Sequence, residues 1–217
     1  MNEAETAAMT PTRLADYRPP DYRVTQVDLS FSLDPERTIV KARLSIRRAP
    51  HADEGAALVL NGEALKLLRI AIDEDDLGAH QYTLSADTLT IHRPPHDFML
   101  DIETCIAPEA NTALSGLYLS SGMFCTQCEA EGFRRITYFP DRPDVLATYS
   151  VRIEADKARY PVLLSNGNLL AQGDLPAGQH YAQWADPHPK PSYLFALVAG
   201  DLVAAEDQFT TRSGRKV

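Results

Sequence analysis

Two runs of strict alternation between apolar and polar residues constrain the fold of this chain more than any other feature. Residues 27–33 carry an apolar side chain at every second position, and residues 40–46 repeat the pattern after the turn DPER at 34–37. A period of two places the apolar set on one face of a β-strand. The two runs therefore predict an antiparallel hairpin with one buried face and one wet face.

The same rhythm of short strands and turns continues along the chain. Turn dipeptides such as Asn61-Gly62 and Asn166-Gly167, and the stretch DPHPKPS at 186–192, separate the runs. No segment longer than about ten residues keeps a helical period. Further strands are predicted at residues 58–60, 65–72, 81–84, 88–92, 98–106, 149–153, 162–164, 168–172, 179–184 and 193–199. The pattern predicts an all-β sandwich or barrel-like assembly of mostly antiparallel strands.

Residues 131–146 are the least strand-like part of the body of the chain. Charges, aromatic residues and two prolines, Pro140 and Pro143, predict a long ordered loop with short helical turns. A loop set into a β scaffold is a common location for functional residues.

Charge and hydropathy exclude two classes of partner. The chain of 217 residues has 21 Lys and Arg against 30 Asp and Glu, a formal charge of −9. Such a field repels phosphate backbones, so we expect no nucleic-acid partner. No apolar stretch approaches the roughly 20 residues that cross a bilayer, so we expect no membrane partner. The first 16 residues are polar, lack the pattern of a signal peptide, and are predicted to be a flexible lead-in.

The cysteines leave three interpretations open. Cys125 and Cys128 have the CxxC spacing of a redox pair or of half a zinc site, with Cys105 as a third ligand. The alternative is small, semi-buried residues on or beside a strand, which we favour because no histidine stands at a supporting spacing. Three cysteines are too few for a disulfide framework, which favours a reduced, cytoplasmic protein.

The histidines predict no metal site. His92 and His96 are four residues apart, but Pro94 and Pro95 between them rule out the helix that would bring two ligands together. No HExxH motif occurs in the sequence. We expect loop positions exposed to solvent for all six histidines, which are His51, His80, His92, His96, His180 and His188.

Gln127 and Glu129 are the candidate binding residues. In an extended segment, residues two apart project to the same side, so a carboxylate and a carboxamide would share one space. The carboxylate offers a charge-assisted hydrogen bond and the carboxamide a neutral acceptor, a combination that suits a cationic amine. The same spacing also occurs on ordinary solvent faces of strands.

The run TQCEAEGFRRITYFPDRPDVLATY at 126–149 resembles the N-terminal domain of bacterial aminopeptidase N, a family of HExxH zinc exopeptidases. The resemblance extends over nearly the whole chain from about residue 14. It also rests on YRPPDYRVTQVDLSFSLDPERTIV at 17–40, YPVLLSNGN at 160–168, KPSYLFALVAGD at 190–201, and FTT with SGR at 209–215.

The resemblance implies a curved β saddle packed on a catalytic domain. It implies a domain at 17–203, followed at 204–217 by a linker and the first strand of a truncated catalytic domain. It also implies that Gln127 and Glu129 line the pocket for the free N-terminus of a peptide substrate. The zinc ligands, the general base and the GAMEN segment of the family are absent, so we expect the parent enzyme to be the zinc hydrolase.

For the chain alone we expect no catalytic residue, no metal ligand, no turnover of an alanyl chromogenic substrate and no stoichiometric zinc. The missing catalytic domain is its expected partner. We expect an exposed apolar docking face near residues 124–138 and 193–201, and artificial dimers of the fragment through that face. The competing hypothesis is a non-enzymatic β-sandwich module for interaction or regulation, in which Gln127 and Glu129 are ordinary surface residues.

Overall fold

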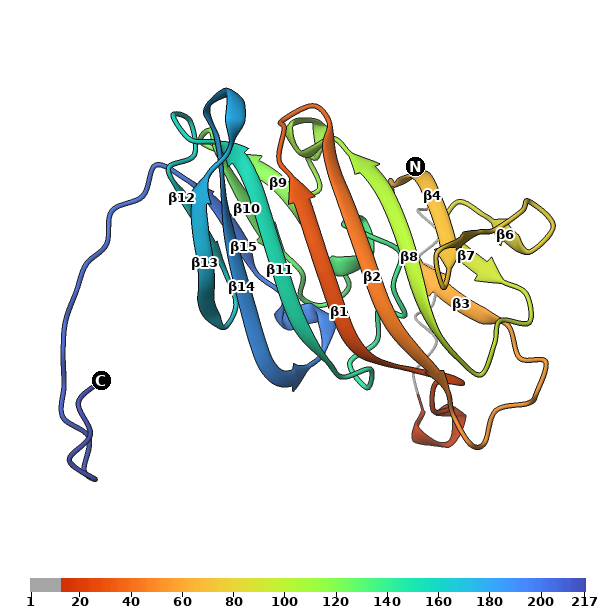
Figure 1. The fold of residues 1–217 in the computed structure, drawn as a ribbon. Helices are drawn as coiled ribbons and strands as arrows, with labels where there is room; N and C mark the ends of the chain where they lie inside the picture. Colours follow the sequence, from red (N-terminus) through yellow and green to blue (C-terminus); the bar gives the residue numbers. More distant parts are fainter. Residues whose placement is uncertain (1–12) are drawn as a thin grey trace, which may run out of the picture.

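A computed structural model describes residues 13–217, which form three β-sheets (Figure 1). The largest sheet has eight strands in the order β13 (Asn168–Asp174), β14 (Gln179–Lys190), β11 (Ala147–Asp156), β1 (Tyr22–Ser32), β2 (Thr38–Arg48), β8 (Asp97–Ile106), β4 (Lys66–Ile72) and β5 (Asp75–Asp76). The second sheet contains β12 (Val162–Ser165), β15 (Leu197–Gly200), β10 (Met123–Gln127) and β9 (Gly116–Ser120). The third contains β3 (Leu58–Asn61), β7 (Thr88–Ile91) and β6 (Tyr82–Leu84).

The remaining regular elements are short 3-10 turns, namely η1 (Leu14–Asp16), η2 (Pro108–Ala110), η3 (Phe133–Arg135), η4 (Pro176–Gly178) and η5 (Ser192–Leu194). The prediction of an all-β fold with mostly antiparallel strands is confirmed. Strand β1 runs parallel to β11 and antiparallel to β2. No helix in residues 13–217 has the length and apolar character needed to cross a membrane.

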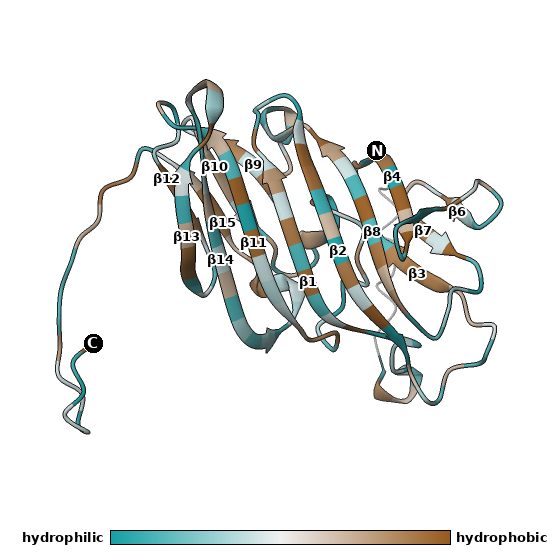
Figure 2. Cartoon of the chain, viewed as in Figure 1, coloured by the Kyte–Doolittle hydropathy of each residue, from teal (hydrophilic) through white to brown (hydrophobic). Residues whose placement is uncertain are grey.

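The predicted hairpin is the centre of the eight-stranded sheet. Strands β1 and β2 pair in antiparallel register, with Val27 opposite Leu44 and Phe31 opposite Val40, and all four side chains are buried. The alternating brown and teal bands along these strands in Figure 2 show the period of two. The apolar set packs inward because its burial is the main favourable contribution to folding.

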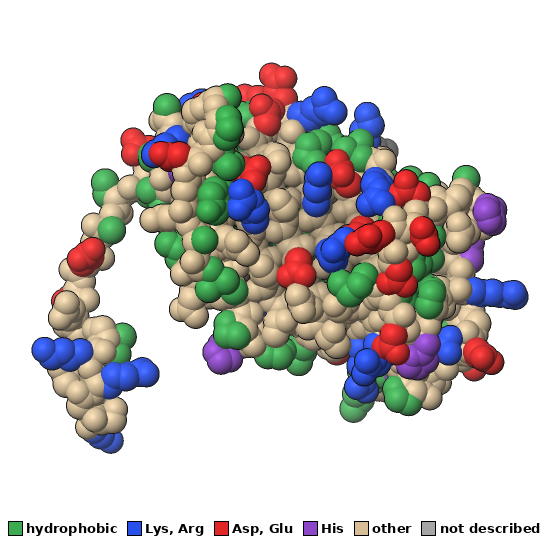
Figure 3. Space-filling view, viewed as in Figure 1, with side chains coloured by type: hydrophobic (Ala, Val, Ile, Leu, Met, Phe, Trp, Pro, Cys, Tyr) green, Lys and Arg blue, Asp and Glu red, His purple; other side chains and the backbone are tan. Residues whose placement is uncertain are grey.

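The other face of this sheet is charged. Arg43 Nε lies 2.7 Å from Asp101 Oδ1, and Lys41 Nζ lies 3.8 Å from Glu103 Oε2 on the neighbouring strand β8. Figure 3 shows positive and negative side chains mixed across this face. Opposite charges directly across strands stabilise the pairing, so the face is balanced and wet.

Aromatic side chains form the core between the eight-stranded sheet and the elements behind it. Phe195, which follows η5, stacks on Phe31 of β1 with ring centroids 6.0 Å apart. Phe133 of η3 meets the edge of Phe195 at 5.3 Å and of Phe139 at 5.1 Å. These contacts anchor the loop at 131–146 in the core, and η3 is the short helical turn that the sequence predicts there.

The predicted apolar docking face is wrong for the large side chains near residues 124–138, and in 193–201 it is wrong for Phe195 and Leu197, which are buried as well. Phe124, Phe133, Ile136 and Tyr138 are all buried in the core. They contact other core aromatic residues, as Phe124 does with Tyr160 and Phe133 with Phe139. The sequence pattern alone does not separate a buried aromatic residue from one that is exposed for a partner.

Two secondary-structure predictions near the C-terminal end of the domain, one strand and one turn, also differ from the structure. The predicted strand at 193–199 is the turn η5 followed by β15. The proline-rich stretch at 186–192, predicted to be a turn, mostly continues β14 as far as Lys190. The pairing of β14 with β11 is irregular there, and an irregular register accommodates prolines, which cannot donate to the ladder.

The predicted flexible lead-in at 1–16 lies mostly outside the described residues, which begin at residue 13. Beyond β15 the chain leaves the sandwich as an extended arm (Figure 1). Residues 209–217 of this arm fold back on themselves, with Thr210 bridged to Lys216. The domain boundaries at 17, 203 and 204 stay predictions.

Candidate functional site

Gln127 and Glu129 lie at the end of β10, where the strand gives way to the loop at 131–146. Gln127 is opposite Gly116 of β9, the last pairing of these two strands. Gln127 and Glu129 are exposed, whereas Cys128 between them is buried. This exposure pattern places both polar side chains on the solvent side, as the spacing of two predicts.

The two residues also contact each other. Gln127 Nε2 donates a hydrogen bond to the backbone oxygen of Glu129 at 3.2 Å. This bond uses the nitrogen of the amide and leaves Oε1 available as an acceptor. Within residues 13–217 no side chain forms an ion pair with the Glu129 carboxylate. The peptide bond between Glu129 and Ala130 is cis.

The turn that carries Glu129 is closed by backbone contacts. Gly132 N donates to Cys128 O at 2.8 Å, which closes the turn at 128–132. Turn η3 follows directly, and Arg135 N donates to Gly132 O at 3.0 Å. The position of Glu129 is therefore determined by the segment behind it as well as by β10.

A buried carboxylate holds that segment in place. Asp141 is 4% exposed, and its Oδ2 accepts hydrogen bonds of 3.1 Å from both the backbone N and the Nε of Arg134. Its Oδ1 accepts from Ser192 Oγ at 2.5 Å, which ties the loop to η5. A buried charge needs a partner and hydrogen bonds of this kind. Arg134 Nη1 also lies 3.3 Å from Glu131 Oε2.

Sequence reasoning did not find the residues Asp141, Arg134, Ser192 and Gly132. A polar residue between two prolines in an ordered loop, with an arginine seven positions earlier, is the pattern that could have indicated Asp141. Ser192 is 51 positions away, and no local pattern connects it to Asp141.

The cysteines lie in surroundings that oppose thiolate chemistry. Cys105, Cys125 and Cys128 are free. Burial raises the pKa of the Cys125 thiol, and burial together with the Asp141 carboxylate raises the pKa of Cys128 to about 12. Redox and metal-binding cysteines need the opposite shift. The structure therefore favours the interpretation of Cys125 and Cys128 as packed strand residues.

The part of the chain that the structure describes has no group of three His, Cys, Asp or Glu side chains able to hold a metal ion. The prediction that every histidine is exposed in a loop is wrong for His180, and its loop part is also wrong for His188, because both residues lie on β14. His180 lies on β14, is buried, and its Nε2 is 2.8 Å from Tyr160 O. It packs inward because it falls on the inner face of the strand.

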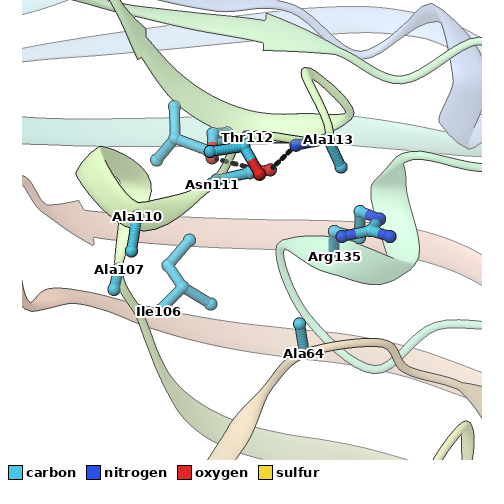
Figure 4. A pocket seen from close by; sticks show the side chains of 9 residues that line it. Ala64, Ile106, Ala107, Ala110, Asn111, Thr112, Ala113 and Arg135 are labelled. Carbon is cyan, nitrogen blue, oxygen red and sulfur yellow. Dashed lines mark hydrogen bonds between the residues drawn. The ribbon is translucent and has the colours of Figure 1, made fainter.

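A cavity of about 270 Å³ opens near η2 and η3, and neither Gln127 nor Glu129 lines it (Figure 4). The amide of Asn111 is fully used, since it donates to Ser115 O and Leu117 O and accepts from Ala113 N. Arg135 pairs with Glu63. The Asn111 amide and the Arg135 guanidinium are therefore already engaged, and the other lining side chains are apolar apart from Thr112. Its walls are Ala64, Ile106, Ala107, Ala110, Asn111, Thr112, Ala113, Leu117 and Arg135.

Comparison with known proteins identifies the class of domain that carries this site. Residues 19–194 match the family model of the peptidase M1 N-terminal domain. The chain belongs to this family, which confirms the resemblance seen in the sequence.

Individual relatives agree with this assignment. The chain is 59% identical over 204 residues to an aminopeptidase N of Caulobacter vibrioides and 54% identical over 202 residues to one of Escherichia coli. These matches cover 94% and 93% of this chain but only 23% of each relative. The chain therefore spans about a quarter of the length of the curated relatives it matches.

Solved structures give the same result. The structure resembles that of Legionella pneumophila aminopeptidase A in complex with aspartic acid, with a TM-score of 0.88 and 41% identity over 95% of this chain and 24% of that one. An M1 zinc metallopeptidase of Deinococcus radiodurans has the same fold, with a TM-score of 0.74 and 17% identity over 91% of this chain and 46% of that one.

Proposed function

We propose that this chain is the N-terminal β domain of a longer zinc aminopeptidase, a hydrolase that removes N-terminal amino acids from peptides. The relatives named aminopeptidase support this proposal, and so does the family of the domain. Its role in the parent enzyme is to supply part of the pocket for the free amine of the substrate and to dock the catalytic domain.

The observation that carries the first role is the exposed Gln127–Glu129 pair. The Glu129 carboxylate and Gln127 Oε1 are two acceptors on adjacent exposed side chains, and the bond from Gln127 Nε2 to Glu129 O orients the amide. A substrate ammonium group donates to both, and a hydrogen bond to a charged partner contributes about 1.5–3 kcal/mol. Holding the amine in this way selects peptides with a free N-terminus and sets which bond is cleaved.

The bond-breaking chemistry belongs to the rest of the parent enzyme. The residues described here form no metal site, and the sequence contains no HExxH. A zinc ion bound elsewhere in the parent would polarise the peptide carbonyl and activate water. The residues of this chain position the substrate's amine relative to that centre.

The second role, docking, is supported by exposed apolar side chains. Leu164 of β12 and Leu194 of η5 are exposed, and Asn166 Nδ2 donates to Leu194 O at 3.1 Å, which connects the two elements. Leu169 and Leu170 of β13 are exposed nearby along the chain. Because the relatives are about four times longer, we assign this surface to the remainder of the parent enzyme. Free cysteines suit a reducing, cytoplasmic location.

The test of the amine-binding role is Glu129→Gln in the full-length parent enzyme. Loss of a charged hydrogen bond of about 1.5–3 kcal/mol lowers kcat/KM on aminoacyl substrates by roughly tenfold to a hundredfold. The matched control is Glu36→Gln, because Glu36 is an exposed carboxylate in the turn between β1 and β2. An unchanged kcat/KM in Glu129→Gln would overturn the proposal and favour the non-enzymatic interaction module.

A further inference from the structure

Gly132 lies where the loop behind Glu129 touches the backbone of β10. A Cβ at this position would stand 2.2 Å from Gln127 O, 2.9 Å from Cys128 Cα and 2.9 Å from Gly116 N. All three neighbours are backbone atoms, which cannot rotate aside as a flexible side chain can. The φ of −84° and ψ of −18° at Gly132 are values that alanine also adopts. The close approach, and not the backbone conformation, therefore requires glycine here.

A second glycine completes this contact from β9. Gly116 has a φ of +76°, and a Cβ there would stand 2.6 Å from Arg135 Cβ and 3.1 Å from Gly132 O. Gly116 is also the strand partner of Gln127. The start of β9, the end of β10 and the start of η3 thus meet at a place where a side chain on either glycine would push them apart.

The contact bears directly on the Gln127–Glu129 pair. Gly132 N donates to Cys128 O, and Gly132 also lies against the backbone oxygen of Gln127. Gly132 therefore contacts both the strand end that carries Gln127 and the turn that carries Glu129. Further along the loop, the hydrogen bonds from Arg134 to the buried Asp141 hold the loop against the end of β10.

We propose that Gly132 is a positioning residue for amine binding. Its missing side chain lets the loop close on the backbone of Gln127 and Cys128, and this closure sets the separation between the Gln127 amide and the Glu129 carboxylate. The inference rests on the proposed function of that pair. It adds that the distance between the two acceptors, and hence the preference for a free amine, depends on a residue that does not touch the substrate.

The structure indicates how far alanine would displace the pair. Ordinary contact with a Cβ begins at 3.4 Å, whereas the Gln127 oxygen lies at 2.2 Å, so the backbone must move by about 1 Å. Misplacement by about 1 Å in a substrate-positioning site costs about a hundredfold in rate. The loss should appear in binding of the amine rather than in every step of the reaction.

The experiment compares Gly132→Ala with Gly55→Ala in the full-length parent enzyme. Gly55 is the matched control, because no atom lies within 4 Å of a Cβ built there. Measurements are KM, kcat, and the inhibition constants of a free amino acid and of its N-acetyl derivative. We expect Gly132→Ala to raise KM and lower kcat/KM by roughly tenfold to a hundredfold. Preference for the free amine over the acetylated form should shrink by a similar factor, with Gly55→Ala unchanged.

Two further variants keep the outcomes distinct. In a Glu129→Gln background, Gly132→Ala should add little, since effects that pass through one contact are not additive. Gly116→Ala presses on the same loop from β9 and should shift the preference in the same direction, which covers the case in which Gly132→Ala does not fold. If Glu129→Gln has no effect, the proposed function fails. If Glu129→Gln lowers activity but both glycine variants keep the wild-type preference, this inference alone is overturned.

Discussion

Asp141→Ala tests whether the buried ion pair with Arg134 holds the loop behind the Gln127–Glu129 pair. The Asp141 side chain is 1% exposed and that of Arg134 is 20% exposed. The substitution removes the acceptor of two bonds from Arg134 and of one from Ser192. It therefore leaves a half-buried guanidinium and a buried hydroxyl without their partner.

The magnitude follows from this burial. Removing one member of a buried ion pair costs about 3–5 kcal/mol. Arg134 keeps its 3.3 Å contact with the exposed Glu131 and some access to water, so the lower end of the range applies. We expect a loss of about 3 kcal/mol in the free energy of unfolding, equivalent to a fall of roughly 6–12 °C in Tm for a domain of this size.

Urea unfolding followed by tryptophan fluorescence measures this loss, since Trp184 is the single tryptophan and lies on β14. The matched control is Asp174→Ala, which breaks the pair with Lys157, because these two side chains are 71% and 55% exposed. An exposed pair contributes at most about 1 kcal/mol. Equal losses in the two variants, or a loss below about 1 kcal/mol in Asp141→Ala, would refute the reasoning from burial.

Two other predictions concern the cysteines and the exposed leucines. The pKa of the Cys128 thiol is 9.0 in the unfolded chain and about 12 in the folded chain. Above pH 9 the unfolded chain therefore loses this proton while the folded chain keeps it, and the free energy of unfolding falls as the pH rises toward 12. Urea unfolding of the wild-type chain should show that the free energy of unfolding is about 1 kcal/mol lower at pH 10 than below pH 9, and this pH dependence should be absent in Cys128→Ala. The same pH dependence in both chains would contradict the assignment of the effect to Cys128. The chain should also self-associate through Leu170 and Leu194, and sedimentation should show that serine at both positions yields monomer. A wild-type monomer would count against the docking surface.

The sequence by itself determined the local parts of this protein. Alternation at residues 27–33 and 40–46 predicts β1 and β2 correctly, because one buried face is enough to impose a period of two. The motif at 126–149 indicated the family, and its spacing placed Gln127 and Glu129 on one side of the chain. Both conclusions depend only on residues close together along the sequence.

Only the tertiary structure decided which side chains are buried and which backbones touch. Proline content predicted a turn at 186–192, yet the pairing of β14 with β11 carries the strand to Lys190. The link from Asp141 to Ser192 and the contact of Gly132 with Gly116 join distant or separate elements. Burial and steric contact depend on distances in space, and a local sequence pattern carries no information about such distances. The contacts that support the Gln127–Glu129 pair are therefore visible only in the tertiary structure.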